Sequence, residues 1–153
     1  MGLSKPIKRF LDTNILVYSL DLSVENRQRH RASLEILRPS STEILCISPQ
    51  ILGEFYAVVT RPSLLANPLT PQETLSRIDR LLQMQHIELL SMSEQVFKRW
   101  LELLKRNPVT GATVFDLMHV ATMMIHGVKS IYTFNVDDFK GITDIEIILP
   151  TGK

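Results

Sequence analysis

Residues 7–14 read IKRFLDTN, an apolar strand pattern that ends in three polar side chains. A strand is expected over Ile7–Leu11, and Asp12, Thr13 and Asn14 follow it where a helix would begin. An Asp at that place can be a simple helix N-cap, whose carboxylate accepts hydrogen bonds from free backbone N–H groups. The carboxyl end of a parallel strand is also where open α/β folds bind ligands. Asp12 is therefore both a capping candidate and a site candidate.

Strand and helix patterns alternate along the rest of the chain. Helical patterns fill the intervals between further strands, which are expected over Glu43–Ile47, Ile87–Leu90, Lys129–Thr133 and Ile145–Leu149. This alternation indicates an α/β protein whose parallel sheet is covered by helices on both faces. Because no linker, low-complexity segment or internal repeat interrupts the pattern, we interpret residues 1–153 as a single domain.

Local patterns also predict helix boundaries. A helix is expected to begin after Ser48, where a capping hydroxyl precedes a proline. Residues 70–73 (TPQE) and 91–94 (SMSE) have the spacing of capping boxes, in which the first and fourth side chains bond each other's backbone. Gly127 is expected to end a helix, because glycine readily adopts the positive φ of a C-terminal cap.

The composition is that of an ordinary globular protein. The chain has 153 residues, of which 44% are hydrophobic, enough for one domain with a core. No apolar run approaches the roughly 20 residues that span a bilayer, and the N-terminus lacks the apolar stretch of a signal peptide. Cys46 is the single cysteine, which excludes an internal disulfide. We therefore expect a cytoplasmic protein without a membrane segment.

Two acidic residues stand on predicted helix faces that are otherwise apolar. Glu54 shares a face with Phe55 and Val58, and Asp116 interrupts a similar stripe within residues 112–123. A buried carboxylate without a partner costs several kcal/mol or takes up a proton. Both residues therefore need a partner if they are buried. The alternatives are a Glu54 that reaches solvent and an Asp116 in the first helical turn, where the helix dipole favours negative charge.

A fourth acid follows the fourth expected strand, in residues 131–139, IYTFNVDDF. Asp137 and Asp138 are neighbours there, and successive side chains point in different directions, so only one is expected to face a site. In a parallel sheet this strand ends at the same edge as the strand that precedes Asp12. The alternative is a polar turn with no further role.

Together these acids predict a divalent-metal site. No run of Lys or Arg adjoins Asp12, Glu54, Asp116 or Asp138, so a cation would balance their charge. Carboxylate oxygens suit Mg²⁺ or Mn²⁺ better than Zn²⁺, and no histidine pair has zinc-motif spacing. His119, one turn after Asp116, is either a support for this site or a buried structural histidine. The chemistry indicates a phosphodiester enzyme in which one ion, held first by Asp12 and Asp116, activates water and a second stabilises the leaving oxygen.

Basic residues gather away from these acids. The net charge is only +1, but with the acids confined to one pocket the remaining surface is more positive. Such a surface favours a polyanionic substrate, although solvated helix faces would give the same composition. The clusters are Arg27, Arg29, His30 and Arg31; Lys98 and Arg99; and Lys105 and Arg106.

The acidic segments, in this order, resemble the PIN-domain nucleases, and above all the VapC-type toxins of bacterial and archaeal toxin–antitoxin pairs. The similarity is carried by residues 10–14 (FLDTN), 47–56 (ISPQILGEFY), 115–121 (FDLMHVA) and 132–139 (YTFNVDDF). It extends from about Lys8 to Pro150. Its most specific parts are the D-T-N start and the T-x-N-x-x-D-F ending.

The resemblance implies a PIN-like α/β/α sandwich around a central, mainly parallel five-stranded sheet, and a Mg²⁺- or Mn²⁺-dependent endoribonuclease. It also implies an RNA substrate, an antitoxin partner and a homodimer. The family's acidic quartet matches Asp12, Glu54, Asp116 and Asp138, and its supporting polar positions match Thr13, Asn14 and Asn135. Some members carry a further acid where Asn135 stands, so a second metal ion would bind more weakly here.

Two other functions fit parts of the pattern. A non-catalytic RNA- or protein-binding module with a PIN-like fold would not need the complete acidic quartet. A phosphohydrolase of the haloacid-dehalogenase type also begins with an Asp at a strand end. That family requires a second Asp two residues later, where this chain has Asn14.

Overall fold

The computed structural model describes residues 4–62, 65, 67–142 and 144–151. Within them, five parallel strands form one sheet in the order β3-β2-β1-β4-β5. The central strand β1 (Ile7–Leu11) lies between β2 (Glu43–Ile47) and β4 (Ser130–Tyr132), with β3 (Ile87–Leu89) and β5 (Glu146–Ile148) at the edges. The predicted parallel sheet is confirmed, and its strands end within one residue of the expected limits.

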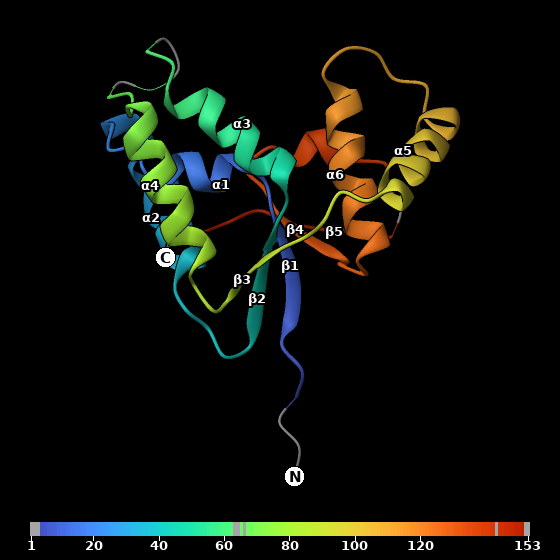
Figure 1. The fold of residues 1–153 in the computed structure, drawn as a ribbon, viewed down its shortest axis with the longest axis horizontal. Coiled ribbons are helices and arrows are strands. Elements are labelled where there is room, and N and C mark those ends of the chain that lie inside the picture. The colour runs from blue at the N-terminus through green and yellow to red at the C-terminus, as the bar shows by residue number, and fades with distance from the viewer. Residues whose placement is uncertain (1–3, 63–64, 66, 143, 152–153) are drawn as a thin grey trace.

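Helices cover the sheet on two sides (Figure 1). One group lies to the left in that view and comprises α1 (Thr13–Tyr18), α2 (Arg27–Leu37), α3 (Pro49–Val59) and α4 (Pro71–Leu82). The other group lies to the right and comprises α5 (Glu94–Arg106) and α6 (Thr113–Ile125). Two short 3-10 helices, η1 (Val24–Asn26) and η2 (Val136–Phe139), complete the described elements. The arrangement is the expected α/β/α sandwich.

The core lies under the carboxyl halves of the strands. Phe10 and Leu11 at the end of β1 are fully buried, whereas Ile7 at its beginning is 54% exposed. Ile47 of β2 and Ile131 of β4 are also fully buried. Burial of these apolar side chains stabilises the carboxyl end of the sheet, where the connections to α1, α3 and η2 start. That end is therefore a rigid base for the polar residues that follow the strands.

Most of the predicted helix boundaries are confirmed. The backbone N–H groups of Ile51 and Glu73 donate to the capping oxygens of Ser48 and Thr70 at 3.2 and 3.1 Å. Gly127 has φ +69° and ends α6, as expected. The capping box predicted for residues 91–94 is wrong, because α5 begins one residue after Ser93 and that serine makes no capping bond with its side chain.

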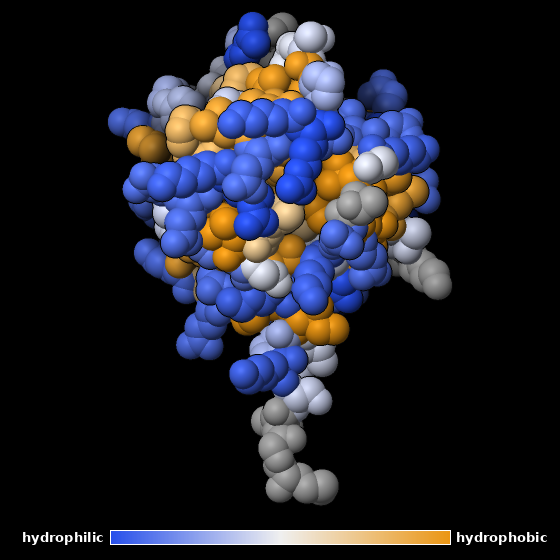
Figure 2. Space-filling view, turned by 90° about the vertical axis from the view of Figure 1, so that its right-hand side faces the viewer, coloured by the Kyte–Doolittle hydropathy of each residue, from blue (hydrophilic) through white to orange (hydrophobic). Residues whose placement is uncertain are grey.

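The outer face of α5 and α6 is mainly charged, with apolar patches between the charged side chains (Figure 2). Phe97 of α5 and Phe115 of α6 are 50% and 57% exposed.

In the described part of the chain, no helix is long and apolar enough to cross a bilayer.

Candidate active site

A cleft of about 560 Å³ opens at the carboxyl ends of the strands. Every site residue predicted from the sequence lines it, although these residues come from four separate segments of the chain. They are Asp12, Thr13, Asn14, Glu54, Asp116, Asn135 and Asp138. The topology accounts for this convergence, since β1 and β4 are neighbours and both end at this edge.

Asp12 lies at the base of the cleft, between β1 and α1. Its Oδ1 accepts a hydrogen bond from the Thr13 N–H at 2.8 Å, so it is the N-cap of α1. Its Oδ2 accepts from Thr133 Oγ1 at 2.7 Å and from Asn14 Nδ2 at 3.2 Å. Burial raises the pKa of Asp12, and the bonds from Thr133 and Thr13 reduce that rise only in part. Asp12 therefore caps α1 and also lines the cleft, and its role in a metal site stays a prediction.

Asn14 links the start of α1 to the segment that follows β4. Its Oδ1 accepts from the backbone N–H of Phe134 at 3.2 Å, just beyond β4. Its Nδ2 donates to Asp12 and, at 3.3 Å, to Thr133 Oγ1. These contacts hold the Asp12 carboxylate in a fixed orientation.

Glu54 reaches the cleft from α3. The prediction of a buried face was only half right, because its side chain is 35% exposed. Its carboxylate accepts hydrogen bonds from Thr13 Oγ1 at 2.6 Å and from Gln50 Nε2 at 2.9 Å. Burial alone would raise the pKa of Glu54, but bonds from His119, Thr13 and Gln50 outweigh it and the pKa is below its usual value. Glu54 is therefore an anion at neutral pH.

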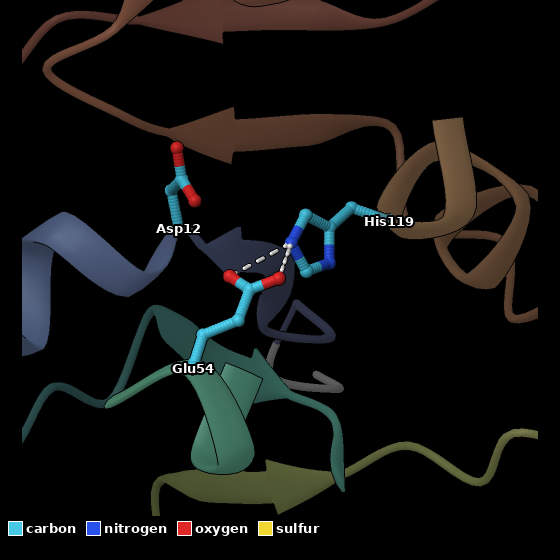
Figure 3. Close-up of side chains that lie close together, drawn as sticks. All are labelled: Asp12, Glu54 and His119. Carbon is cyan, nitrogen blue, oxygen red and sulfur yellow. Dashed lines mark hydrogen bonds and ion pairs between the residues drawn. The ribbon is translucent and has the colours of Figure 1, made fainter. Parts of the chain in front are cut away.

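His119 is the partner of Glu54 that the sequence did not assign (Figure 3). Its Nε2 lies 3.1 Å from Glu54 Oε1, and its side chain is 2% exposed. This geometry places the ring proton on Nε2, so Nδ1 is left as a buried acceptor without a partner among the described residues. Ligand atoms of Asp12, Glu54 and His119 lie within 4.8 Å of one another. The only indication in the sequence was the spacing of one turn from Asp116.

Asp116 lies in the first turn of α6 and is half-buried. The first-turn alternative is therefore correct, yet the side chain also lines the cleft. Burial and the negative charges of Asp138 and Asp12 raise the pKa of Asp116 to about 6. No side chain among the described residues donates a hydrogen bond to it. The described side chains thus offer little compensation for the charge of Asp116.

The structure separates Asp138 from Asp137. Asp138 lines the cleft, whereas Asp137 lies outside its lining and pairs with Lys140 at 2.5 Å on the surface. Phe139 is fully buried beneath this turn. Asp116 and Asp138 are not members of the group within 4.8 Å, so the expected pairing of Asp12 with Asp116 around one ion is not visible in the side-chain positions.

The cleft also contains residues that sequence reasoning missed. Tyr18, Asp21 and Asn26 line it beyond the acidic end, and Thr133 supports Asp12 from behind. Asp21 accepts hydrogen bonds from Ser23 and Asn26, which lower its pKa although burial opposes this. Their segment, residues 18–26, has no apolar periodicity interrupted by an acid, the feature that identified Glu54 and Asp116.

Comparison with known proteins identifies this architecture. The family model of the PIN domain matches residues 9–144, most of the chain. The chain belongs to the PIN domain family. PIN domains are nucleases, so the acidic cleft belongs to a protein of a family that hydrolyses phosphodiester bonds in nucleic acids. A comparison with curated proteins gives no match.

Solved PIN-domain structures share this fold. VapBC2 from Rickettsia felis, bound to a promoter DNA fragment, is 20% identical with a TM-score of 0.64 over 93% of this chain and 98% of that chain. VapC20 from Mycobacterium tuberculosis, a toxin that cleaves the sarcin–ricin loop, is 16% identical with a TM-score of 0.62 over 90% and 98%. VapBC-1 from nontypeable Haemophilus influenzae is 19% identical with a TM-score of 0.62 over 93% and 97%.

The donor set of this PIN domain fits a hard divalent cation. No Lys or Arg is among the described residues that line the cleft, although five carboxylates do. Oxygen ligands of this kind suit Mg²⁺ or Mn²⁺. The ionised form of Asp116, which repels Asp138 and Asp12 and receives no hydrogen bond from a described side chain, would be stabilised by a bound cation.

Proposed function

We propose that this PIN domain is a Mg²⁺- or Mn²⁺-dependent endoribonuclease. The observation that supports this most strongly is that the acidic quartet, namely Asp12, Glu54, Asp116 and Asp138, lines a single cleft to which the described residues contribute no Lys or Arg. A polyanionic strand cannot approach such a cleft closely unless bound cations neutralise it. The substrate and the metal requirement therefore belong to the same hypothesis.

The roles that we propose for these residues keep the ligand set expected from the family resemblance. Asp12 and Asp116 would hold the first ion, and Glu54 and Asp138 would complete the coordination directly or through water. When bound, such cations supply an activated water and stabilise charge on the leaving oxygen. Thr13 and Asn14 keep the carboxylates of Glu54 and Asp12 in place, and Asn135 closes the side next to β4.

His119 has a positioning role in this proposal. Its ring lies against Phe10 with centroids 5.7 Å apart, which fixes the imidazole below the cleft. From there Nε2 holds Glu54 in the orientation in which its carboxylate faces Asp12. This contact would preorganise the carboxylates of Glu54 and Asp12 as ligands for one cation.

The biological role that we propose is that of the toxin in a type II toxin–antitoxin pair acting in the cytoplasm. Structural neighbours from Klebsiella pneumoniae and Salmonella typhimurium are toxin–antitoxin complexes, and VapC20 is itself an RNA-cleaving toxin. The exposed Phe97 and Phe115 supply apolar surface for an antitoxin or for a second copy in a homodimer.

The test is the chemistry of the products. Purified protein should cut single-stranded RNA with Mg²⁺ or Mn²⁺ and leave a 5′-phosphate and a 3′-hydroxyl, because a metal-activated water does not use the ribose 2′-OH. Chelation by EDTA should stop the reaction. Cleavage in EDTA, or products that end in a 2′,3′-cyclic phosphate, would contradict the proposal. RNA binding without cleavage under all metal conditions would favour the non-catalytic module instead.

A further inference from the structure

The cleft extends beyond the carboxylates to a second, less acidic end. α1 runs along it from Thr13 at the acidic end to Tyr18, a distance of about 7.5 Å at the rise of an α-helix. The walls at the far end include Val17 and, from α3, Ala57 and Val58. This end therefore combines apolar walls and an aromatic ring with a single carboxylate, that of Asp21, which accepts hydrogen bonds from Ser23 and Asn26. It lies about one nucleotide away from the carboxylates that would bind metal.

Contacts from three sides fix the position of Tyr18. The Phe134 ring meets its ring at 85°, with centroids 5.2 Å apart. The guanidinium carbon of Arg29 lies 5.2 Å from the centroid of the same ring. His30 Nδ1 contacts the backbone oxygen of Tyr18 at 2.9 Å. A ring held in this way loses little conformational freedom when it packs against a ligand.

Arg29 is a positioned cation at the edge of the cleft. One guanidinium nitrogen donates to Tyr18 Oη and to Asn26 Oδ1, each at 3.2 Å, and Asn26 is in turn bonded to Asp21 at 2.7 Å. Among the described residues, no carboxylate forms an ion pair with Arg29, which is exposed. Its Nε and second NH₂ groups are therefore available, and a guanidinium binds phosphate through such paired donors.

The charge distribution of the cleft suits a role for Arg29 in binding a substrate phosphate. Bound metal ions would neutralise the carboxylates at the acidic end, but the described residues of the cleft walls include no Lys or Arg for the phosphate of an adjacent nucleotide. Arg29 does not line the cleft itself, but it donates hydrogen bonds to Tyr18 and Asn26, which do, and we expect its free guanidinium donors to reach that phosphate. Neighbouring basic residues of α2, such as the exposed Arg31, have no comparable contact with the cleft.

We propose that Tyr18 and Arg29 form a nucleotide-binding subsite next to the scissile phosphate. A nucleobase of single-stranded RNA packs against the part of the Tyr18 ring that lines the cleft, and the guanidinium of Arg29 binds the phosphate of the same nucleotide. The inference rests on the proposed ribonuclease function and specifies how that function holds its substrate. A duplex cannot use the subsite, because its bases are already stacked and paired.

Binding of a fluorescein-labelled oligouridylate, followed by anisotropy with Mn²⁺ at several salt concentrations, tests the subsite. All variants carry Asp116→Asn, so that the strand stays intact. Arg29→Ala should weaken binding several-fold. It should also make the negative slope of log K against log salt shallower by about 0.7, the value for one phosphate contact on a single strand. The control Arg31→Ala, which removes the same charge from the same helix, should have at most a small effect.

Tyr18 variants provide the second test. Tyr18→Leu should weaken binding by about tenfold, because contact between a base and an aromatic ring is lost, whereas Tyr18→Phe should keep most of the affinity. Circular dichroism checks that Tyr18→Leu is folded. If Tyr18→Leu is unfolded, the Arg29→Ala variant still tests the subsite. Without the Asp116 substitution, Arg29→Ala should raise KM and leave kcat nearly unchanged.

The outcomes separate this inference from the proposed function. Equal affinities and equal salt slopes for Arg29→Ala and Arg31→Ala overturn the subsite, whether both match the parent protein or both fall by the same amount. If the wild-type protein fails to cleave RNA but Arg29→Ala alone loses oligouridylate binding, the subsite holds and the nuclease proposal is wrong.

Discussion

Removing the charge of Asp116 should stabilise the metal-free protein at neutral pH, which is unusual for a substitution at a half-buried position. Asp116 is partly removed from solvent, faces the charges of Asp138 and Asp12 in the cleft, and receives no hydrogen bond from a described side chain. Asn has nearly the same shape but no charge. In Asp116→Asn the repulsion therefore disappears, while the packing of the first turn of α6 is kept.

The pKa of Asp116 sets the size of the effect. Its rise from 3.8 to about 6 corresponds to about 3 kcal/mol if the shift were fully expressed in stability. Because the carboxylate is only half-buried, solvent screening reduces this to about 1 kcal/mol. The sign follows from proton binding. The native state holds the Asp116 proton more tightly than the unfolded chain, so stability falls as pH rises from about 4 to about 6, and the loss is complete above that range.

Urea denaturation in EDTA at about pH 4 and about pH 7 measures this effect. Asp116→Asn should be about 1 kcal/mol more stable than wild type at the higher pH and close to it at the lower pH. Asp137→Asn is the matched control, because Asp137 is exposed and pairs with Lys140 outside the cleft, and it should show no gain. If Asp116→Asn loses stability at neutral pH, or gains as much at low pH as at neutral pH, the electrostatic reasoning is wrong.

Three further predictions concern the same cleft. Added Mn²⁺ should raise the melting temperature of wild type more than that of Asp116→Asn, by mass action on the native state, and equal shifts in a thermal-shift assay would place the metal elsewhere. Asp138→Ala should lose most RNA cleavage at saturating Mn²⁺ and Asp137→Ala little, since only Asp138 lines the cleft; the reverse result would exchange their roles. His119→Gln should lower the free energy of unfolding by about 1–3 kcal/mol, because a buried hydrogen bond to Glu54 is disturbed, and a loss no larger than that of His126→Gln, at a histidine that is only partly buried, would argue against this contact.

The strand ends and the acids on helices could be predicted because each breaks a local pattern. Asp12 follows an apolar strand, and Glu54 and Asp116 interrupt apolar helix faces. A parallel sheet then places the ends of β1 and β4 at one edge without further assumptions. The extent of burial was overestimated, because Glu54 and Asp116 stand at the margins of their helix faces and border the open cleft.

The supporting contacts could not be predicted, because they depend on side chains far apart in the sequence. His119 and Glu54 are brought together only when α6 and α3 meet across the sheet, and Thr133 reaches Asp12 only through the pairing of β4 with β1. The capping box at residues 91–94 failed for a local reason. Two serines, Ser91 and Ser93, could each precede the helix, and the spacing favoured the one that the structure does not use.

The central claim is that the acidic cleft is a metal-dependent centre for RNA cleavage. Comparing wild type with Asp12→Asn tests it most directly, because Asp12 is the buried carboxylate of the cleft and its amide keeps the size of the side chain. With saturating Mn²⁺ and a single-stranded RNA substrate, wild type should cleave. Asp12→Asn should be folded by circular dichroism and inactive, because a ligand and a charge are lost together. Full Mn²⁺-dependent cleavage by Asp12→Asn would contradict the account.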